Sequence, residues 1–260
     1  MLPTPRQATT VAAIAATLLI VAGPAYGGSR TNNSNSMTVR EVIDRSVALS
    51  PGAEASLESI AGPVTIETGG NDIAQIHIIR GGATARDLAC YKTEVDASAS
   101  RLRIYHIQDK SRECRNIRSR QEVRLILPRS VNLSMSSVAG DVDIAPIDGR
   151  LELSSIAGQV HAHGVRQADL SSIAGGLQLD LGQLDTRGIQ VSSVVGPTQI
   201  RFAPGANADV RVDSVIGNVT SATPAIAIGY HSGSAVARVG AGGVPVSVSS
   251  VVGSVTLQGN

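Results

Sequence analysis

Short alternations of apolar and polar residues recur along most of the chain after residue 50. In the segment LELSSIAGQVHA, residues 151–162, Leu151 and Leu153 alternate with polar residues. After a Ser-Ser corner and a glycine, Val160 and Ala162 alternate with polar residues again. A period of two is typical of β-strands that bury one face. Each such segment therefore predicts two short strands joined by a corner.

Seven segments share this pattern, and each has a glycine at the same place after its corner. They are residues 55–66, 133–144, 151–162, 168–179, 189–200, 210–221 and 246–257. Between Gly140 and Gly217 the shared glycines recur every 17 to 21 residues. From Gly217 to Gly253 the step is 36 residues, which predicts one degenerate repeat between them, around Gly229 to Gly240.

One repeat of two strands cannot bury its own apolar face, whereas stacked repeats can. The sequence therefore predicts an all-β fold, a β-solenoid (β-helix-like) of stacked Gly/Ser-cornered rungs of about 17–21 residues. A folded-back β-sandwich of the same repeats is the alternative. Within a rung we expect the inward-facing side chains to switch from one alternating set of residues to the other. This change of parity needs a bend, which we expect at the glycine, for example Gly158. The corner serines predict a structural column: Ser59, Ser137, Ser155, Ser172, Ser193, Ser214 and Ser250.

The N-terminal residues resemble an export signal. Arg6 precedes an apolar run, residues 10–22, and small residues follow it, which together are typical of a secretory signal peptide, residues 1–27. A retained anchor is the alternative, although the run is shorter than the about 20 residues that span a bilayer. We expect a polar, disordered lead-in at 28–39 and one β-repeat domain at 40–260. The mature chain is then a periplasmic, cell-surface or secreted protein and not an integral membrane protein.

The exported part contains two cysteines, Cys90 and Cys114. In an oxidising compartment such a pair predicts a disulfide. On the chain-entropy model, closing this loop stabilises the folded state by about 3 kcal/mol. A redox or metal pair is the alternative, but the CxxC spacing of such sites is absent. No cofactor is predicted.

Basic residues are concentrated in one excursion between the repeats, at about 84–122. Residues 80–130 hold 12 basic and 6 acidic groups. The chain after Arg6 as a whole is balanced, with 21 basic and 21 acidic residues. Arginine suits phosphate and carboxylate ligands, so we expect anionic envelope glycans or lipopolysaccharide as partners. A merely solvating surface is the alternative. Nucleic acid is not expected, since aromatic residues make up only 2% of the chain. The candidate anion-binding residues are Arg112, Arg115, Arg118, Arg120 and Arg124.

A second candidate site follows from aligning the repeats by their glycines. If rungs stack in register, Asp143, His161, His163 and Asp180 become neighbours on one outward face. Two histidines with flanking carboxylates can hold zinc or a similar ion. An ordinary polar outer face is the alternative reading of these residues.

The segment LILPRSVNLSMSSVAGDVDIAPIDGRLELSSIAGQV, residues 125–160, resembles the bacterial putative-adhesin family of β-strand-repeat envelope proteins, a domain of unknown function. The resemblance covers roughly residues 40–260. It implies an exported, non-enzymatic domain with a role in adhesion or in sensing envelope stress. It supplies no catalytic residues.

These observations predict a non-enzymatic, adhesin-like binding or scaffold module that contacts envelope polymers or an envelope protein. A self-associating structural solenoid is the alternative, because the last strand segment, residues 254–258, ends the chain without a cap and predicts an exposed edge that pairs end to end. A polysaccharide-active β-helix enzyme is the third possibility; such enzymes need paired carboxylates, and here the carboxylates are scattered.

Overall fold

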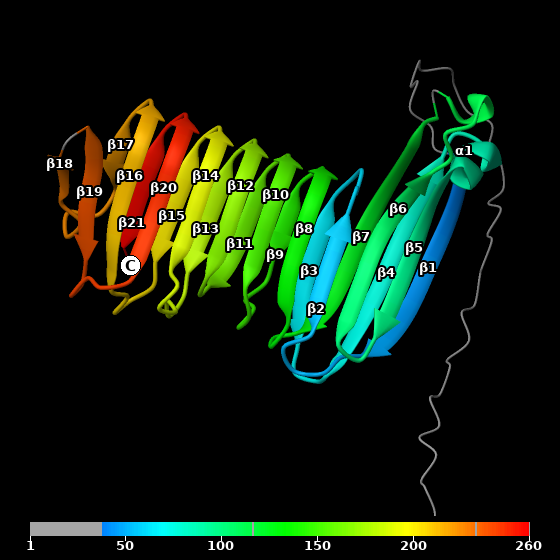
Figure 1. The fold of residues 1–260 in the computed structure, drawn as a ribbon, viewed down its shortest axis with the longest axis horizontal. Coiled ribbons are helices and arrows are strands. Elements are labelled where there is room, and N and C mark those ends of the chain that lie inside the picture. Colours follow the sequence, from blue (N-terminus) through cyan, green and yellow to red (C-terminus); the bar gives the residue numbers. More distant parts are fainter. Residues whose placement is uncertain (1–37, 116, 232, 260) are drawn as a thin grey trace, which may run out of the picture.

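The computed structural model describes residues 38–115, 117–231 and 233–259. The expected signal peptide and nearly all of the expected lead-in lie outside these residues. The described chain is all-β: two large open sheets face each other, and only one short α-helix and one 3-10 turn accompany them (Figure 1). No helix among the described residues has the length and apolar character needed to cross a membrane.

Within the described residues, sheet A has ten strands and sheet B has eleven. In spatial order, sheet A consists of β1 (Val39–Ala48), β4 (Ile73–Gly82), β7 (Ser119–Pro128), β3 (Val64–Gly69), β9 (Val142–Ile144), β11 (Val160–Val165), β13 (Leu177–Leu181), β15 (Thr198–Phe202), β21 (Val255–Gly259) and β17 (Val219–Ser221). Sheet B consists of β18 (Ile228–His231), β19 (Ser234–Val239), β16 (Ala208–Ile216), β20 (Pro245–Val252), β14 (Ile189–Val195), β12 (Ala168–Ala174), β10 (Leu151–Ala157), β8 (Asn132–Ala139), β2 (Glu54–Glu58), β6 (Arg101–Gln108) and β5 (Tyr91–Ser98). The helices are α1 (Ala85–Cys90) and η1 (Arg112–Cys114).

Each repeat contributes one strand to each sheet. The strands of successive repeats pair in parallel, so that equivalent positions lie side by side: Met135, Leu153 and Leu170 are register partners in sheet B. Their side chains are at most 1% exposed and point toward the other sheet. The repeat thus buries its apolar face only through its neighbours and the facing sheet, as the stacking argument requires.

The change of parity within a rung occurs at the corner serine and not at the glycine, so the expected position of the bend was wrong. Leu153 and Ile156 are both buried, although two residues separate them, because Ser155 has a left-handed backbone (φ 56°) and is skipped in the pairing register. Left-handed backbone is unusual for a residue with a Cβ. Among the residues that the structure describes, serines with φ between 54° and 60° are Ser59, Ser137, Ser155, Ser172, Ser193 and Ser250.

The shared glycines are required by close stacking. A Cβ on Gly158 would lie only 2.2 Å from the carbonyl oxygen of Gly140 in the neighbouring rung. The same clash, at 1.9 to 2.2 Å, recurs along the column of Gly140, Gly158, Gly175, Gly196, Gly253 and Gly217. Glycine is therefore the residue that lets neighbouring backbones approach at this corner.

The C-terminal rungs do not stack in sequence order. The last repeat enters between the two that precede it, since β20 pairs with both β14 and β16 and β21 pairs with both β15 and β17. The expected degenerate rung around Gly229 to Gly240 is instead an antiparallel hairpin, β18–β19, that extends sheet B beyond β16. The last strand is therefore interior, and the expected exposed edge at residues 254–258 was wrong. The edges at this end are β17 and β18.

The basic excursion at 84–122 is part of the stack rather than a loop beside it. It contains α1, η1, the strands β5 and β6 that end sheet B, and the first residues of β7. β7 lies between β3 and β4, pairing in parallel with the first and antiparallel with the second. This arrangement brings the arginines of the excursion next to the N-terminal strands.

Candidate functional site

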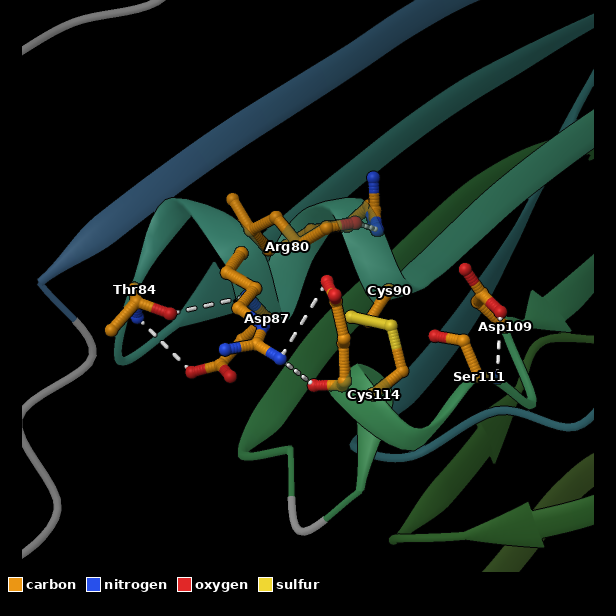
Figure 2. Close-up of a disulfide and its surroundings, with 10 residues drawn as sticks. Arg80, Thr84, Asp87, Cys90, Asp109, Ser111 and Cys114 are labelled. Carbon is orange, nitrogen blue, oxygen red and sulfur yellow. Dashed lines mark hydrogen bonds and ion pairs between the residues drawn. A yellow bond between two sulfur atoms is a disulfide. The ribbon is translucent and has the colours of Figure 1, made fainter.

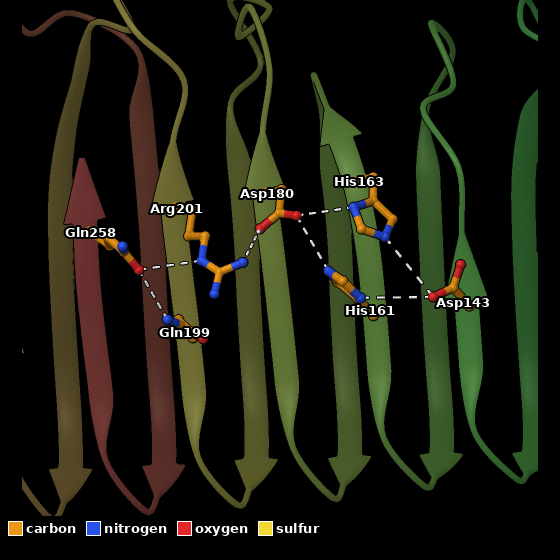
Figure 3. A network of polar contacts seen from close by, with 7 residues as sticks. All are labelled: Asp143, His161, His163, Asp180, Gln199, Arg201 and Gln258. Atoms are coloured by element: carbon orange, nitrogen blue, oxygen red, sulfur yellow. Dashed lines mark hydrogen bonds and ion pairs between the residues drawn. The ribbon is translucent and has the colours of Figure 1, made fainter. Parts of the chain in front are cut away.

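The outward face of sheet A carries rows of polar side chains, because parallel register aligns equivalent positions of successive rungs. His161 is the register partner of Asp143 in β9 and of Gln178 in β13. His163 lies two residues further along β11 on the same side of the strand. The expected juxtaposition of the two histidines with Asp143 and Asp180 is what the structure shows (Figure 3). We call these four residues the histidine–aspartate cluster.

In this cluster both imidazoles lie between two carboxylates. Asp180 Oδ2 is 3.3 Å from His161 Nε2 and 3.0 Å from His163 Nδ1. On the other side, Asp143 Oδ2 is 3.7 Å from His161 Nδ1 and 3.9 Å from His163 Nε2. The two rings are 3.7 Å apart between centroids. Each histidine therefore presents one nitrogen to each carboxylate.

The cluster continues into a polar network that sequence reasoning missed (Figure 3). Asp180 Oδ1 is 3.6 Å from Arg201 Nη1, and Arg201 Nε donates to Gln258 Oε1 at 3.2 Å. The Gln199 amide also donates to Gln258 Oε1, at 3.1 Å. Arg201 could have been found, since it occupies the position of Asp180 in the next repeat. Gln258 could not, because its strand was expected to lie three rungs away.

The arginines of the excursion are distributed over two elements. Arg112 belongs to η1, Arg115 follows it, and Arg120 and Arg124 lie on exposed positions of β7. Arg118 lies just before β7 and is exposed. Arg124 is paired with Glu122 of the same strand at 2.9 Å, so its charge is already balanced.

One further arginine joins this region through the fold. Gly81 of β4 pairs with Arg40 of β1 on one side and with Arg120 of β7 on the other. Both are exposed, and the glycine between them places no side chain in the gap of about 9–10 Å between the two strands. Within the described part of the chain, no carboxylate forms an ion pair with the four residues that we call the arginine end: Arg40, Arg112, Arg115 and Arg120.

The predicted disulfide between Cys90 and Cys114 is present and joins the last residue of α1 to η1 (Figure 2). Both cysteines are buried. Thr84 caps α1 by accepting a hydrogen bond from the Asp87 backbone, and the Asp87 carboxylate accepts one from the Thr84 backbone. Arg86 also reaches the Glu113 carbonyl of η1. The segment that carries Arg112 and Arg115 is therefore tied to the end of the stack.

Beneath this segment lies a buried arginine. Arg80 is 6% exposed, pairs with Glu41 at 2.5 Å, and donates to the Leu88 carbonyl at 2.9 Å. Burial lowers the pKa of Arg80, although Glu41 opposes this effect. Burial also lowers the pKa of His106, which lines the same small cavity with Arg80 and Gln121. Arg80 and Gln121 are buried, whereas His106 is partly exposed.

No protein-family model matches the chain, and no curated protein matches it. Solved structures do match at low identity. A putative cell adhesion protein from Clostridium sporogenes is 12% identical and has a TM-score of 0.46 over 84% of this chain and 99% of the other. A putative adhesin from Bacteroides fragilis is 13% identical, with a TM-score of 0.31 over 83% and 96% of the two chains. A putative lipid binding protein from Parabacteroides distasonis is 14% identical, with a TM-score of 0.24 over 88% and 98%. The first is described as a cell adhesion protein and the second as an adhesin.

Proposed function

We propose that this chain is a non-enzymatic, adhesin-like binding module of the cell envelope. We infer that its stacked rungs form a two-sided β-solenoid, and that the arginine end contacts anionic envelope polymers such as lipopolysaccharide or acidic glycans. The observation that carries the proposal is that Arg40, Arg112, Arg115 and Arg120 gather at one end of the stack without a carboxylate in ion-pair contact among the described residues.

Arginine recognises phosphate and carboxylate groups through its planar fork of donors. Several arginines elsewhere on the molecule are balanced by carboxylates: Arg150 contacts Glu152 and Asp169, and Arg238 contacts Asp209. The charges of the arginine end are left for an external anion. The disulfide supports an extracytoplasmic location, because such bonds persist in oxidising compartments.

The test is binding of the purified protein to lipopolysaccharide vesicles and to a neutral glycan at low and high salt. The triple variant R112Q/R115Q/R120Q should bind the anionic surface about tenfold more weakly at low salt, and the difference should shrink at high salt. The matched control, R129Q/R187Q/R238Q, removes the same charge from exposed positions elsewhere in the chain. Equal losses in the two triple variants would contradict the proposal, since only net charge would then matter.

Self-association is the second candidate, and one surface feature favours it. Val195, Val252 and Ile216 are register neighbours at the corner of the last rungs and are 58%, 47% and 73% exposed. Neighbouring exposed aliphatic side chains often mark an interface. Light scattering at high concentration should then detect dimers that I216D abolishes. A strictly monomeric wild-type protein would remove this candidate.

A further inference from the structure

The histidine–aspartate cluster has an arrangement of donors and acceptors that an ordinary polar surface does not need. A neutral imidazole has one N–H group and one lone pair. Asp180 Oδ2 is at hydrogen-bond distance from His161 Nε2 and His163 Nδ1, so it accepts the N–H of both rings. Their lone pairs, on His161 Nδ1 and His163 Nε2, are then directed toward Asp143.

Three electron-pair donors therefore face one another. Asp143 Oδ2 is 3.7 Å from His161 Nδ1 and 3.9 Å from His163 Nε2, longer than hydrogen bonds, and one ligand atom of each residue lies within 4.8 Å of the others. A carboxylate and two imidazole lone pairs repel one another unless a cation lies between them. We propose that Asp143, His161 and His163 bind a divalent transition-metal ion of the Zn²⁺ type.

The distances fit such an ion after small side-chain movements. Tetrahedral Zn²⁺ bonds of about 2.0–2.1 Å place neighbouring ligand atoms roughly 3.4 Å apart. The donors need to approach by about 1.5 Å at most. Asp143 can move most, because its side chain is 56% exposed, whereas the histidines are 32% and 36% exposed. The ligands come from adjacent strands whose backbone register is set by the stack.

Asp180 is the positioning residue of this site. Metal-binding histidines commonly donate their second N–H to a carboxylate, which fixes the tautomer and the ring orientation. Here one carboxylate serves both rings, and Arg201 contacts its other oxygen. Two nitrogen ligands favour Zn²⁺, Ni²⁺ or Cu²⁺ over Ca²⁺ and Mg²⁺, which prefer oxygen ligands. Three protein ligands leave one coordination position open to the outer face, for water or an anionic group.

The test is a Zn²⁺ titration of the purified protein, without a polyhistidine tag and freed of metal by dialysis against a chelator, in competition with a chromogenic chelator. The wild-type protein should bind one Zn²⁺ per chain, and H161Q/H163Q should bind at least about 100-fold more weakly. D180N should weaken binding by about 10–100-fold and keep the stoichiometry. Cobalt(II) should give visible absorption bands of a tetrahedral site in the wild-type protein and not in H161Q/H163Q.

The matched control is His77→Gln. His77 also faces outward from sheet A and contacts a carboxylate, Asp44, at 2.5 Å, but it has no second histidine beside it on its strand. The H77Q variant should bind Zn²⁺ as tightly as the wild-type protein. Equal affinities of wild type and H161Q/H163Q, or an equal loss in H77Q, would overturn the proposal. Circular dichroism shows whether each variant is folded, and D143N gives an independent test in which only the carboxylate ligand changes. This result does not depend on anionic polymers binding at the arginine end.

Discussion

Arg201 donates a hydrogen bond to Gln258 across two neighbouring strands, although 57 residues separate them in the sequence. The contact exists because the last repeat returns to fill the space between β15 and β17. The same insertion places β20 between β14 and β16. The C-terminal strand is consequently held by neighbours on both sides, and the hairpin β18–β19 covers the end of sheet B.

The stacked glycines should tolerate no side chain. We expect Gly158→Ala to lower the free energy of unfolding by about 1–3 kcal/mol, because its Cβ would meet the Gly140 carbonyl oxygen. Urea denaturation measures the change. Gly70→Ala is the control, since a Cβ there meets nothing within 4 Å, and it should leave stability within about 0.5 kcal/mol. Equal effects of the two substitutions would contradict the stacking account.

Replacing either of two adjacent corner serines by glycine should change the stability of the protein in opposite directions. Ser155 has a left-handed backbone that costs a residue with a Cβ about 1–2 kcal/mol, which glycine relieves. Ser154 is paired within the strand, so S154G should destabilise the protein by about 0.5–1 kcal/mol. We expect S155G to be more stable than S154G by about 1–2 kcal/mol in chemical denaturation. If S154G proves the more stable variant, the parity change does not depend on Ser155.

The buried ion pair should matter more than an exposed one. Glu41→Gln leaves Arg80 charged and buried without its carboxylate, and we expect a loss of about 3 kcal/mol in the free energy of unfolding. The matched substitution Glu122→Gln removes the partner of the exposed Arg124 and should cost less than about 1 kcal/mol. Thermal and urea denaturation of both variants provide the comparison. A loss at Glu41 no larger than that at Glu122 would show that water reaches Arg80.

Acidification should destabilise the protein through His106. Burial lowers its folded-state pKa below the ordinary 6.5, and the positive charge of Arg80 acts in the same direction. Between the two pKa values the unfolded state therefore binds more protons than the folded state. The stabilising contribution of neutral His106 is complete above about pH 6.5 and is lost as the pH falls from there toward the folded-state pKa. Unfolding free energies measured between pH 8 and pH 5 should decline more in the wild-type protein than in H106Q. Parallel profiles would assign the decline to other groups.

The sequence alone predicted the repeat, the all-β class, the disulfide and the meeting of the four residues of the histidine–aspartate cluster. These features depend on short-range regularity. Once repeats of 17 to 18 residues stack in parallel, residues one repeat apart must become neighbours, as Asp143 and His161 do. The pairing of Cys90 with Cys114 needed no tertiary information either, because the chain has only two cysteines.

Only the tertiary structure decided the order of the terminal rungs, the position of the parity change and the placement of Arg40 and Arg120 on the two sides of Gly81. A strand edge offers the same unpaired backbone groups to any strand that arrives, so the choice of neighbour depends on the whole chain. The repeat pattern of residues 246–257 is the same whether the strands lie at the end or between two earlier rungs. Likewise, both serines of a corner have the same local sequence signal, and packing against the facing sheet selects which one takes the left-handed backbone.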